Sequence, residues 1–245
     1  MARFFITFQY DGSAYHGWQI QPNGDSVQEE MQKALSTLLR EPVEVVGAGR
    51  TDAGVHASMM VAHFDTDAGF DEEQLAYRLN KILPRDIAVR GIRRVRDDMH
   101  ARFSAVSRTY HYYIHTHKNP FINDYSCLLH YKLDVDKMNE AGRFLTTCHD
   151  FAAFCKSHTD VKTTLCDVTE ARWEWMGDGR LMFTITANRF LRNMVRAVVG
   201  TMVDVGRGRL SLEDFQRVVG SRKRTKAGES MPAHALFLHD IRYDG

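Results

Sequence analysis

Residues 166–187 read CDVTEARWEWMGDGRLMFTITA, and this stretch decides the fold class. Residues 166–175 and 180–187 have the β-branched and aromatic composition of strands, and the short segment Gly177-Asp178-Gly179 lies between them. A turn this short joins antiparallel strands, because a parallel connection needs a long crossover segment. We therefore expect a β-hairpin at this point of the chain.

Strands and helices are interspersed on both sides of this hairpin. Ser26 and Glu29 have capping-box spacing, and apolar residues recur on one helical face from residue 27 to residue 39. Further strands are expected at 4–9, 43–48, 59–64, 87–95 and 109–116, and further helices at 71–82, 135–145 and 191–205. Strands joined by hairpins as well as by helices favour an α+β fold, with a mostly antiparallel sheet and flanking helices, over a doubly wound parallel sheet.

The composition indicates a folded globular protein without identifying a partner. Of the 245 residues, 44% are hydrophobic and 26% are charged, which is ordinary for globular proteins and argues against wholesale disorder. The formal net charge of +1 gives no global argument for a polyanionic partner. A case for nucleic acid must therefore rest on local clusters of charge.

Cysteine usage and the hydropathy pattern indicate the compartment. The four cysteines are too few and too irregularly spaced for a disulfide framework, which favours a reducing cytosol. The N-terminus runs into an alternating apolar stretch rather than a signal peptide, and no run approaches the ~20 apolar residues that span a bilayer. We expect a soluble cytoplasmic protein that has no membrane segment.

An acidic loop is the strongest candidate for chemistry. Asp52 lies in residues 47–57, GAGRTDAGVHA, which have too many glycines for the middle of a strand or helix. Glycines allow close approach to a ligand and positive φ, and loops of this kind often present functional side chains. The same residues are also typical of a turn in which Thr51 or Asp52 caps the backbone. The spacing alone does not choose between these two interpretations.

Further motifs along the chain point to one family. Beginning at Gly49 the acidic loop reads GRTDAGVH, and the earlier segment 10–19 reads YDGSAYHGWQ. Other stretches follow in order: SVQE at 26–29, DDMHARFSA at 97–105, RTY at 108–110, HDF at 149–151, and MVR at 194–196 within 190–200. Together, these motifs resemble the TruA family of tRNA pseudouridine synthases over nearly the whole chain.

The resemblance implies the functional residues. Asp52 matches the family's nucleophilic aspartate, Tyr110 matches the tyrosine that packs on the target uracil, and Arg196 matches the basic partner of the aspartate. Arg50 is our candidate for the side chain that replaces a flipped-out base or holds the splayed strand. Without the resemblance, Tyr110 is typical of a core tyrosine in a strand and Arg196 of a solvated helix face.

The resemblance also implies the fold, the reaction and the partner. It predicts two related halves, 1–104 with the aspartate loop and 105–245 with the tyrosine and arginine, in a continuous, mostly antiparallel sheet with a central active-site cleft. The implied reaction isomerises uridine to pseudouridine at positions 38, 39 and 40 of the tRNA, in its anticodon stem-loop. A homodimer is expected, and neither a cofactor nor a DNA partner is.

Local basic clusters support an RNA partner. Arginines and lysines gather at residues 90–96, 189–196 and 222–226, and Phe103 and Tyr110 interleave with them. Clusters of this kind are usually solvated faces, so each of them is weak alone. Taken together, they are typical of a groove that binds RNA.

The residues leave some alternatives open and exclude others. Cys148, His149, Cys155 and His158 are of metal-ligating types, but their spacing matches no common zinc pattern, so no metal is expected. An aspartic hydrolase needs a second carboxylate turn, which the sequence lacks. A module that only binds RNA remains open. So does the chemistry, since the carboxylate of Asp52 can attack C1′, assist glycal formation or attack C6 of the uracil.

Overall fold

The computed structural model describes residues 1–22, 24–156 and 161–244. The chain forms two compact units: unit 1 comprises Met1–Val106 with Phe237–Gly245, and unit 2 comprises Ser107–Leu236. These units differ from the predicted halves 1–104 and 105–245 chiefly at the C-terminus, which belongs with unit 1. The physical reason is a strand pairing over a long sequence distance, described next.

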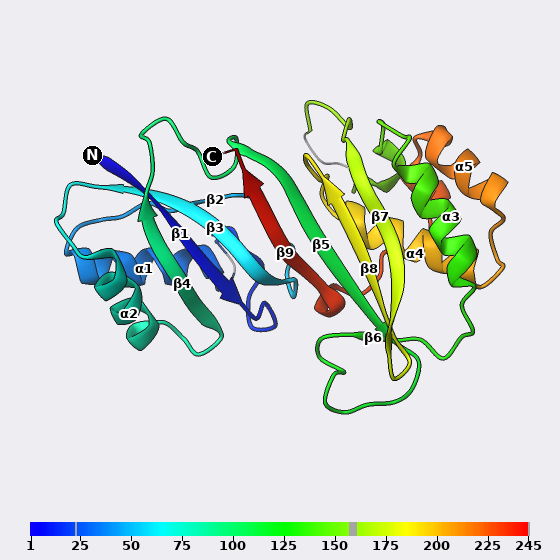
Figure 1. Ribbon diagram of the computed structural model, residues 1–245, viewed down its shortest axis with the longest axis horizontal. Coiled ribbons are helices and arrows are strands. Elements are labelled where there is room, and N and C mark those ends of the chain that lie inside the picture. Colours follow the sequence, from blue (N-terminus) through cyan, green and yellow to red (C-terminus); the bar gives the residue numbers. More distant parts are fainter. Residues whose placement is uncertain (23, 157–160, 245) are drawn as a thin grey trace. The chain divides into compact units, whose positions relative to one another are not determined.

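Unit 1 consists of a sheet and two helices (Figure 1). Its elements are β1 (Ala2–Tyr10), α1 (Val27–Leu39), β2 (Val46–Gly47), β3 (His56–Thr66), α2 (Glu72–Ile82), β4 (Ile87–Arg94) and β9 (Leu236–Tyr243). Strand β1 lies between β4 and β3 and is antiparallel to both, and β2 pairs antiparallel with β3. Strand β9 pairs in parallel with the start of β3, with Phe237 opposite His56. This pairing attaches the C-terminal segment to unit 1.

Unit 2 contains the predicted hairpin. Its elements are β5 (Ala105–His115), β6 (Cys127–Leu128), α3 (Val135–Leu145), η1 (Ala152–Phe154), β7 (Val168–Gly177), β8 (Arg180–Ala187), α4 (Met194–Gly206), α5 (Leu212–Ser221), η2 (Arg224–Lys226) and η3 (Ala233–Ala235). Strand β8 lies between β5 and β7 and is antiparallel to both, while the short β6 pairs in parallel with β5. The α+β class and the mostly antiparallel pairing are confirmed.

The turn between β7 and β8 has the conformation that its residues favour. Gly177 pairs with Arg180, so only Asp178 and Gly179 form the loop. Both loop residues have positive φ, 51° and 66°, as a type I′ turn requires. Asp-Gly is a preferred pair for this turn, and its backbone twist matches that of the flanking antiparallel strands.

The two units share an order of elements. Unit 1 begins strand, helix, strand, strand, helix (β1, α1, β2, β3, α2), and unit 2 repeats this order with β5, α3, β7, β8 and α4, apart from the inserted β6. In each unit the first and second of these strands both pair antiparallel with the third. The two units thus share a topology, while the predicted bounds of the two halves stay a prediction.

Helix α1 forms as its capping pattern predicts, and it shortens the neighbouring strand. The Ser26 hydroxyl accepts a hydrogen bond from the Glu29 N–H at 3.3 Å. Residues 43–48 were expected to be a strand, but only Val46–Gly47 pairs with β3. The reason is that side chains of α1 bind the backbone just before this pair: the Val45 N–H donates to the Gln32 amide oxygen at 3.0 Å.

A buried histidine of β3 makes the stability of unit 1 depend on pH. His63 is 5% exposed, and its Nδ1 accepts a hydrogen bond from the Ala101 N–H at 3.1 Å. Burial, together with the positive charges of Arg3 and His100, lowers the pKa of His63 to about 4 from its ordinary 6.5. The folded chain therefore requires the neutral ring.

We expect the free energy of unfolding to fall as the pH drops from 6.5 to about 4, because the unfolded chain binds a proton at His63 before the folded chain does. His63 contributes up to about 3 kcal/mol to this loss. In His63→Asn, the amide oxygen can still accept the bond from Ala101, and this part of the pH dependence disappears. Urea denaturation of both proteins across this range measures it, and identical pH dependences would contradict the role of His63.

Candidate active site

Hydrogen bonds hold Asp52 from both sides within unit 1. Its neighbour Thr51 is buried, and the hydroxyl oxygens of Thr51 and Tyr10 lie 2.8 Å apart. The Thr51 carbonyl accepts a hydrogen bond from the Trp18 N–H at 3.3 Å. After Asp52, the Val55 N–H donates to the Asp52 carbonyl at 3.1 Å and closes a turn. The half-buried Asp52 thus lies on a loop whose main chain is fixed.

The hydrogen bonds of this turn disfavour a capping role for the Asp52 carboxylate. A capping aspartate accepts from an N–H two or three residues further on, which here belongs to Gly54 or Val55. The Gly54 N–H donates to the Tyr15 carbonyl at 3.4 Å, and the Val55 N–H donates to the Asp52 carbonyl. Main-chain carbonyls therefore accept from both of these N–H groups and close the turn.

Residues 10–19 pack against the loop that carries Asp52. Gly17 has φ +99°, and a Cβ at this position would lie 2.4 Å from the Thr51 carbonyl oxygen. The Gly12 N–H donates to Nδ1 of His56 at 3.0 Å, and His56 is buried at the start of β3. The motif YDGSAYHGWQ therefore has a structural meaning: it packs against the aspartate loop and needs glycine where the two backbones meet.

Arg50 lies two residues before Asp52 on the same loop and is exposed. Within the part of the chain that the structure describes, its guanidinium group makes no hydrogen bond or ion pair. A fixed loop with an unpaired arginine is suited to bind an anionic ligand such as a phosphodiester.

Tyr110 lies on β5 in unit 2 and is partly exposed. It pairs with Ile185 of β8, and its ring meets the ring of Phe190 edge to face, with the centroids 5.0 Å apart. Two residues further along the strand, on the same face, Tyr112 is fully buried. It is therefore Tyr112 that is the core tyrosine of this strand, whereas Tyr110 lies where the same face reaches solvent.

Arg196 lies in the first turn of α4 and is partly buried. Its Nε donates to the Met231 carbonyl at 2.5 Å, and the Met231 N–H donates back to the Arg196 carbonyl at 3.1 Å. Burial raises the pKa of Tyr112, and the positive charge of Arg196 opposes this rise. Arg196 is therefore held by the main chain at Met231, acts electrostatically on Tyr112, and is not a solvated arginine.

The structure groups the four predicted residues into two pairs. Arg50 and Asp52 share one loop of unit 1, while Tyr110 on β5 and Arg196 on α4 both belong to unit 2. A single pocket formed by all four residues, in a cleft between the halves, stays a prediction.

The cysteines and histidines considered for metal binding have other contacts. Nδ1 of His149 lies 2.9 Å from a carboxylate oxygen of Asp167, and Cys148 and Cys155 are free thiols. His158 lies outside the described residues. Among those that are described, no group of three or more His, Cys, Asp or Glu side chains is arranged to hold a metal ion. No described helix is long and apolar enough to cross a membrane.

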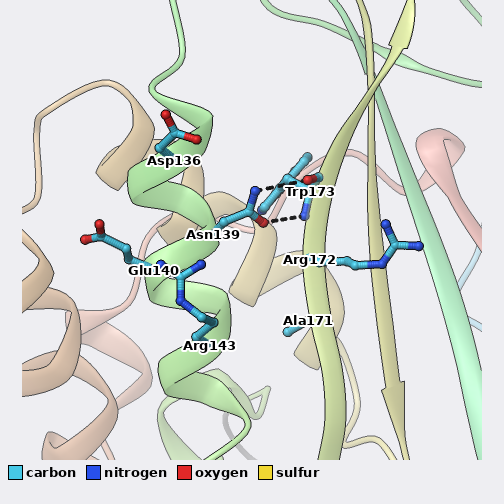
Figure 2. A pocket seen from close by; sticks show the side chains of 7 residues that line it. All are labelled: Asp136, Asn139, Glu140, Arg143, Ala171, Arg172 and Trp173. Carbon is cyan, nitrogen blue, oxygen red and sulfur yellow. Dashed lines mark hydrogen bonds between the residues drawn. The ribbon is translucent and has the colours of Figure 1, made fainter.

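Two surface hollows of unit 2 contain none of the predicted residues. One, of about 450 Å³, lies between α3 and β7 (Figure 2). There the Asn139 amide nitrogen donates to the Trp173 carbonyl at 3.0 Å, and the Trp173 N–H donates to the Asn139 amide oxygen at 2.7 Å. These two hydrogen bonds satisfy main-chain groups on the outer edge of β7. The other, of about 600 Å³, lies beside Trp175 and Arg207. Both are open and form where helices meet the strand edge.

Comparison with known proteins identifies the family. The sequence profile described as tRNA pseudouridine synthase matches residues 6–104 and 148–244, which is most of the chain. The chain belongs to the tRNA pseudouridine synthase family. The matched segments of this synthase family member include Arg50, Asp52 and Arg196, whereas Tyr110 lies in the stretch between the two segments.

Individual synthases are similar over the whole chain. tRNA pseudouridine synthase A of Bacteroides thetaiotaomicron is 55% identical over 245 residues, covering 99% of this chain and 91% of the relative. The Bacteroides fragilis synthase is 54% identical over 242 residues, covering 98% and 96%. The Bacillus subtilis synthase is 40% identical over 246 residues, covering 99% of both chains.

The sequence alone did not predict the residues that support the Asp52 loop of this synthase. The motif at residues 10–19 contains Tyr10 and Gly17 but by itself assigns no role to either residue. The signal was present in the sequence, since a tyrosine at the end of an apolar strand and two glycines in a short loop indicate a close contact. Only the structure shows that the partner of this contact is the loop at Thr51.

Gly17→Ala is expected to displace the Asp52 loop, because a methyl group there meets the Thr51 carbonyl oxygen and the φ of +99° disfavours alanine. We expect a loss of about 1–3 kcal/mol in the free energy of unfolding and faster hydrogen exchange at residues 50–55. Gly69→Ala is the matched control, since a Cβ at Gly69 has no atom within 4 Å. If the two variants behaved alike, the contact at Gly17 would not support the loop.

Proposed function

We propose that this protein isomerises uridine to pseudouridine in tRNA, with Asp52 as the nucleophile. The observation that carries the proposal is the aspartate loop of a tRNA pseudouridine synthase family member: its main chain is fixed by Thr51 and by the turn to Val55, while main-chain carbonyls take the N–H groups that a capping aspartate would use. The fixed main chain thus sets the position from which the Asp52 carboxylate acts.

The reaction explains why a held carboxylate is needed. The N1–C1′ bond of uridine must break, the detached uracil must turn, and a bond from C5 to C1′ must form. An aspartate can form a covalent bond at C1′, as in retaining glycosidases, or assist the loss of a proton that gives a glycal, or add to C6. In each case Asp52 must stay within bonding distance of the nucleotide while the base moves, and a fixed loop favours this.

Tyr110, Arg196 and Arg50 have proposed roles around this chemistry. The partly exposed ring of Tyr110, held edge to face by Phe190, can stack on uracil in any orientation and retain it while it turns. Arg196, fixed to the Met231 carbonyl, is suited to orient a carboxylate. Arg50 is proposed to hold the splayed strand once the target base is flipped out.

The proposed targets are uridines 38, 39 and 40 in the anticodon stem-loop, and the proposed assembly is a homodimer in the cytoplasm. The relatives at 40–55% identity are named tRNA pseudouridine synthase A, which supports tRNA as the substrate. The free thiols of Cys127, Cys148, Cys155 and Cys166 suit a reducing compartment. No cofactor is needed for the isomerisation as proposed.

Asp52→Asn is expected to lower pseudouridine formation by at least about four orders of magnitude, because it removes the nucleophile while keeping the size of the side chain. Binding of tRNA is expected to stay within about threefold of wild type. Carbodiimide adduct mapping measures the product and filter binding measures affinity. Asp67→Asn, which alters an exposed carboxylate of unit 1, is the control. Normal product from Asp52→Asn would refute the assignment of Asp52 as the nucleophile, whereas a wild-type protein that binds tRNA and forms no pseudouridine would be an RNA-binding module.

Tyr110→Ala is expected to weaken tRNA binding or turnover by about tenfold or more, because the stacking surface for the base is lost. Tyr110→Phe keeps that surface and should retain affinity, while a fall in its turnover alone would mark a proton transfer by the hydroxyl. Tyr77→Ala, which removes a 58% exposed tyrosine of α2, is the control. Unchanged binding and turnover in Tyr110→Ala would refute the stacking role.

A further inference from the structure

Phe103 is a rigidly held aromatic ring on the surface of unit 1. Its side chain is 77% exposed, which is unusual for a phenylalanine, since burial of such a ring contributes substantially to folding. It follows Arg102 in the segment 99–104, after strand β4 and before strand β5. Neither residue has a role in the site described above.

The backbone around Phe103 is fixed by hydrogen bonds on every side. The Ala101 N–H donates to His63, and the Ala101 carbonyl accepts from the Tyr243 hydroxyl at 2.7 Å. The Arg102 and Phe103 N–H groups both donate to Nδ1 of His100, at 3.1 and 3.3 Å. The backbone that carries the side chains of Arg102 and Phe103 is therefore held in one conformation.

The Phe103 ring rests on a column of rings that begins in the core. His63 on β3 is buried, the His100 ring meets it at 4.5 Å between centroids, and the Phe103 ring lies 4.4 Å beyond His100. Burial, followed by the charges of Arg3 and Arg102, lowers the pKa of His100. The lowered pKa favours the neutral His100 ring, whose Nδ1 accepts from the N–H groups of Arg102 and Phe103. These two hydrogen bonds fix the orientation of the His100 ring beneath Phe103.

Arg102 adds a positive charge to this aromatic surface. Its guanidinium carbon lies 5.7 Å from the centroid of the Phe103 ring. A preorganised aromatic face with an arginine beside it is the arrangement that holds an unpaired base together with its phosphate.

We propose that Phe103 and Arg102 form a tRNA contact outside the Asp52 loop, in which Phe103 stacks on an unpaired base and Arg102 neutralises a neighbouring phosphate. This inference rests on the proposed function, because it takes tRNA as the partner. A second copy of the chain is the alternative occupant of this surface, and the molecular mass measured below distinguishes it from tRNA.

The test is a substitution series at residue 103, read by tRNA affinity. Phe103→Leu is expected to weaken binding of unmodified tRNA at least about fivefold, and Phe103→Tyr to restore it, because stacking needs a ring and not merely an apolar side chain. Arg102→Gln is expected to lower the slope of log affinity against log salt by about one. Phe121→Leu is the matched control, since Phe121 is 89% exposed in unit 2. Thermal unfolding of each variant verifies folding.

Light scattering of the same proteins distinguishes the outcomes. A loss of affinity in Phe103→Leu with an unchanged molecular mass and with rescue by tyrosine supports the contact. Equal affinity of Phe103→Leu and wild type overturns it, and so does a loss of affinity that appears only together with a loss of molecular mass, because the face would then join two copies of the chain. Affinity is read without turnover, so the result is separate from whether the wild-type protein forms pseudouridine.

Discussion

The hydrogen bond between the buried hydroxyls of Tyr10 and Thr51 is the contact on which the geometry of the candidate site depends. It joins the end of strand β1 to the residue before Asp52, across 41 residues of chain. Loss of the Tyr10 hydroxyl would remove this hydrogen bond from the buried Thr51 hydroxyl, which costs about 1–3 kcal/mol. With the contact of Gly17 at the Thr51 carbonyl, it makes the position of Asp52 a property of the sheet and not of a mobile loop.

The repeated order of elements explains how one chain supplies chemically different residues. Each unit runs strand, helix, strand, strand, helix, but the functional positions in the two units do not correspond. Unit 1 presents Asp52 from the connection into the third strand of its repeat, β3, whereas unit 2 presents Tyr110 from the first strand of its repeat, β5, and Arg196 from the helix after β8. In the proposed function, the second repeat thus contributes a stacking surface and a fixed positive charge instead of a second acid.

Local signals made part of this structure predictable. The Asp178-Gly179 turn and the Ser26 cap depend on a few adjacent residues, so the sequence indicates them directly. Long-range pairings were not predictable. Strand β9 joins β3 although His56 and Phe237, which pair, are 181 positions apart in the sequence, and the expected strand at 43–48 is shortened by a side chain of a helix. Periodicity also could not tell Tyr110 from Tyr112, because both lie on the same face of β5 and differ only in distance from the core.

The central claim is that the fixed aspartate loop of this family member acts on uridines of the anticodon arm. The most direct measurement is site-resolved mapping of pseudouridine in an unmodified tRNA incubated with the purified protein. We predict new pseudouridine at one or more of tRNA positions 38, 39 and 40, and at none of them with Asp52→Asn. Product only outside the anticodon arm, or product that survives Asp52→Asn, would contradict the account.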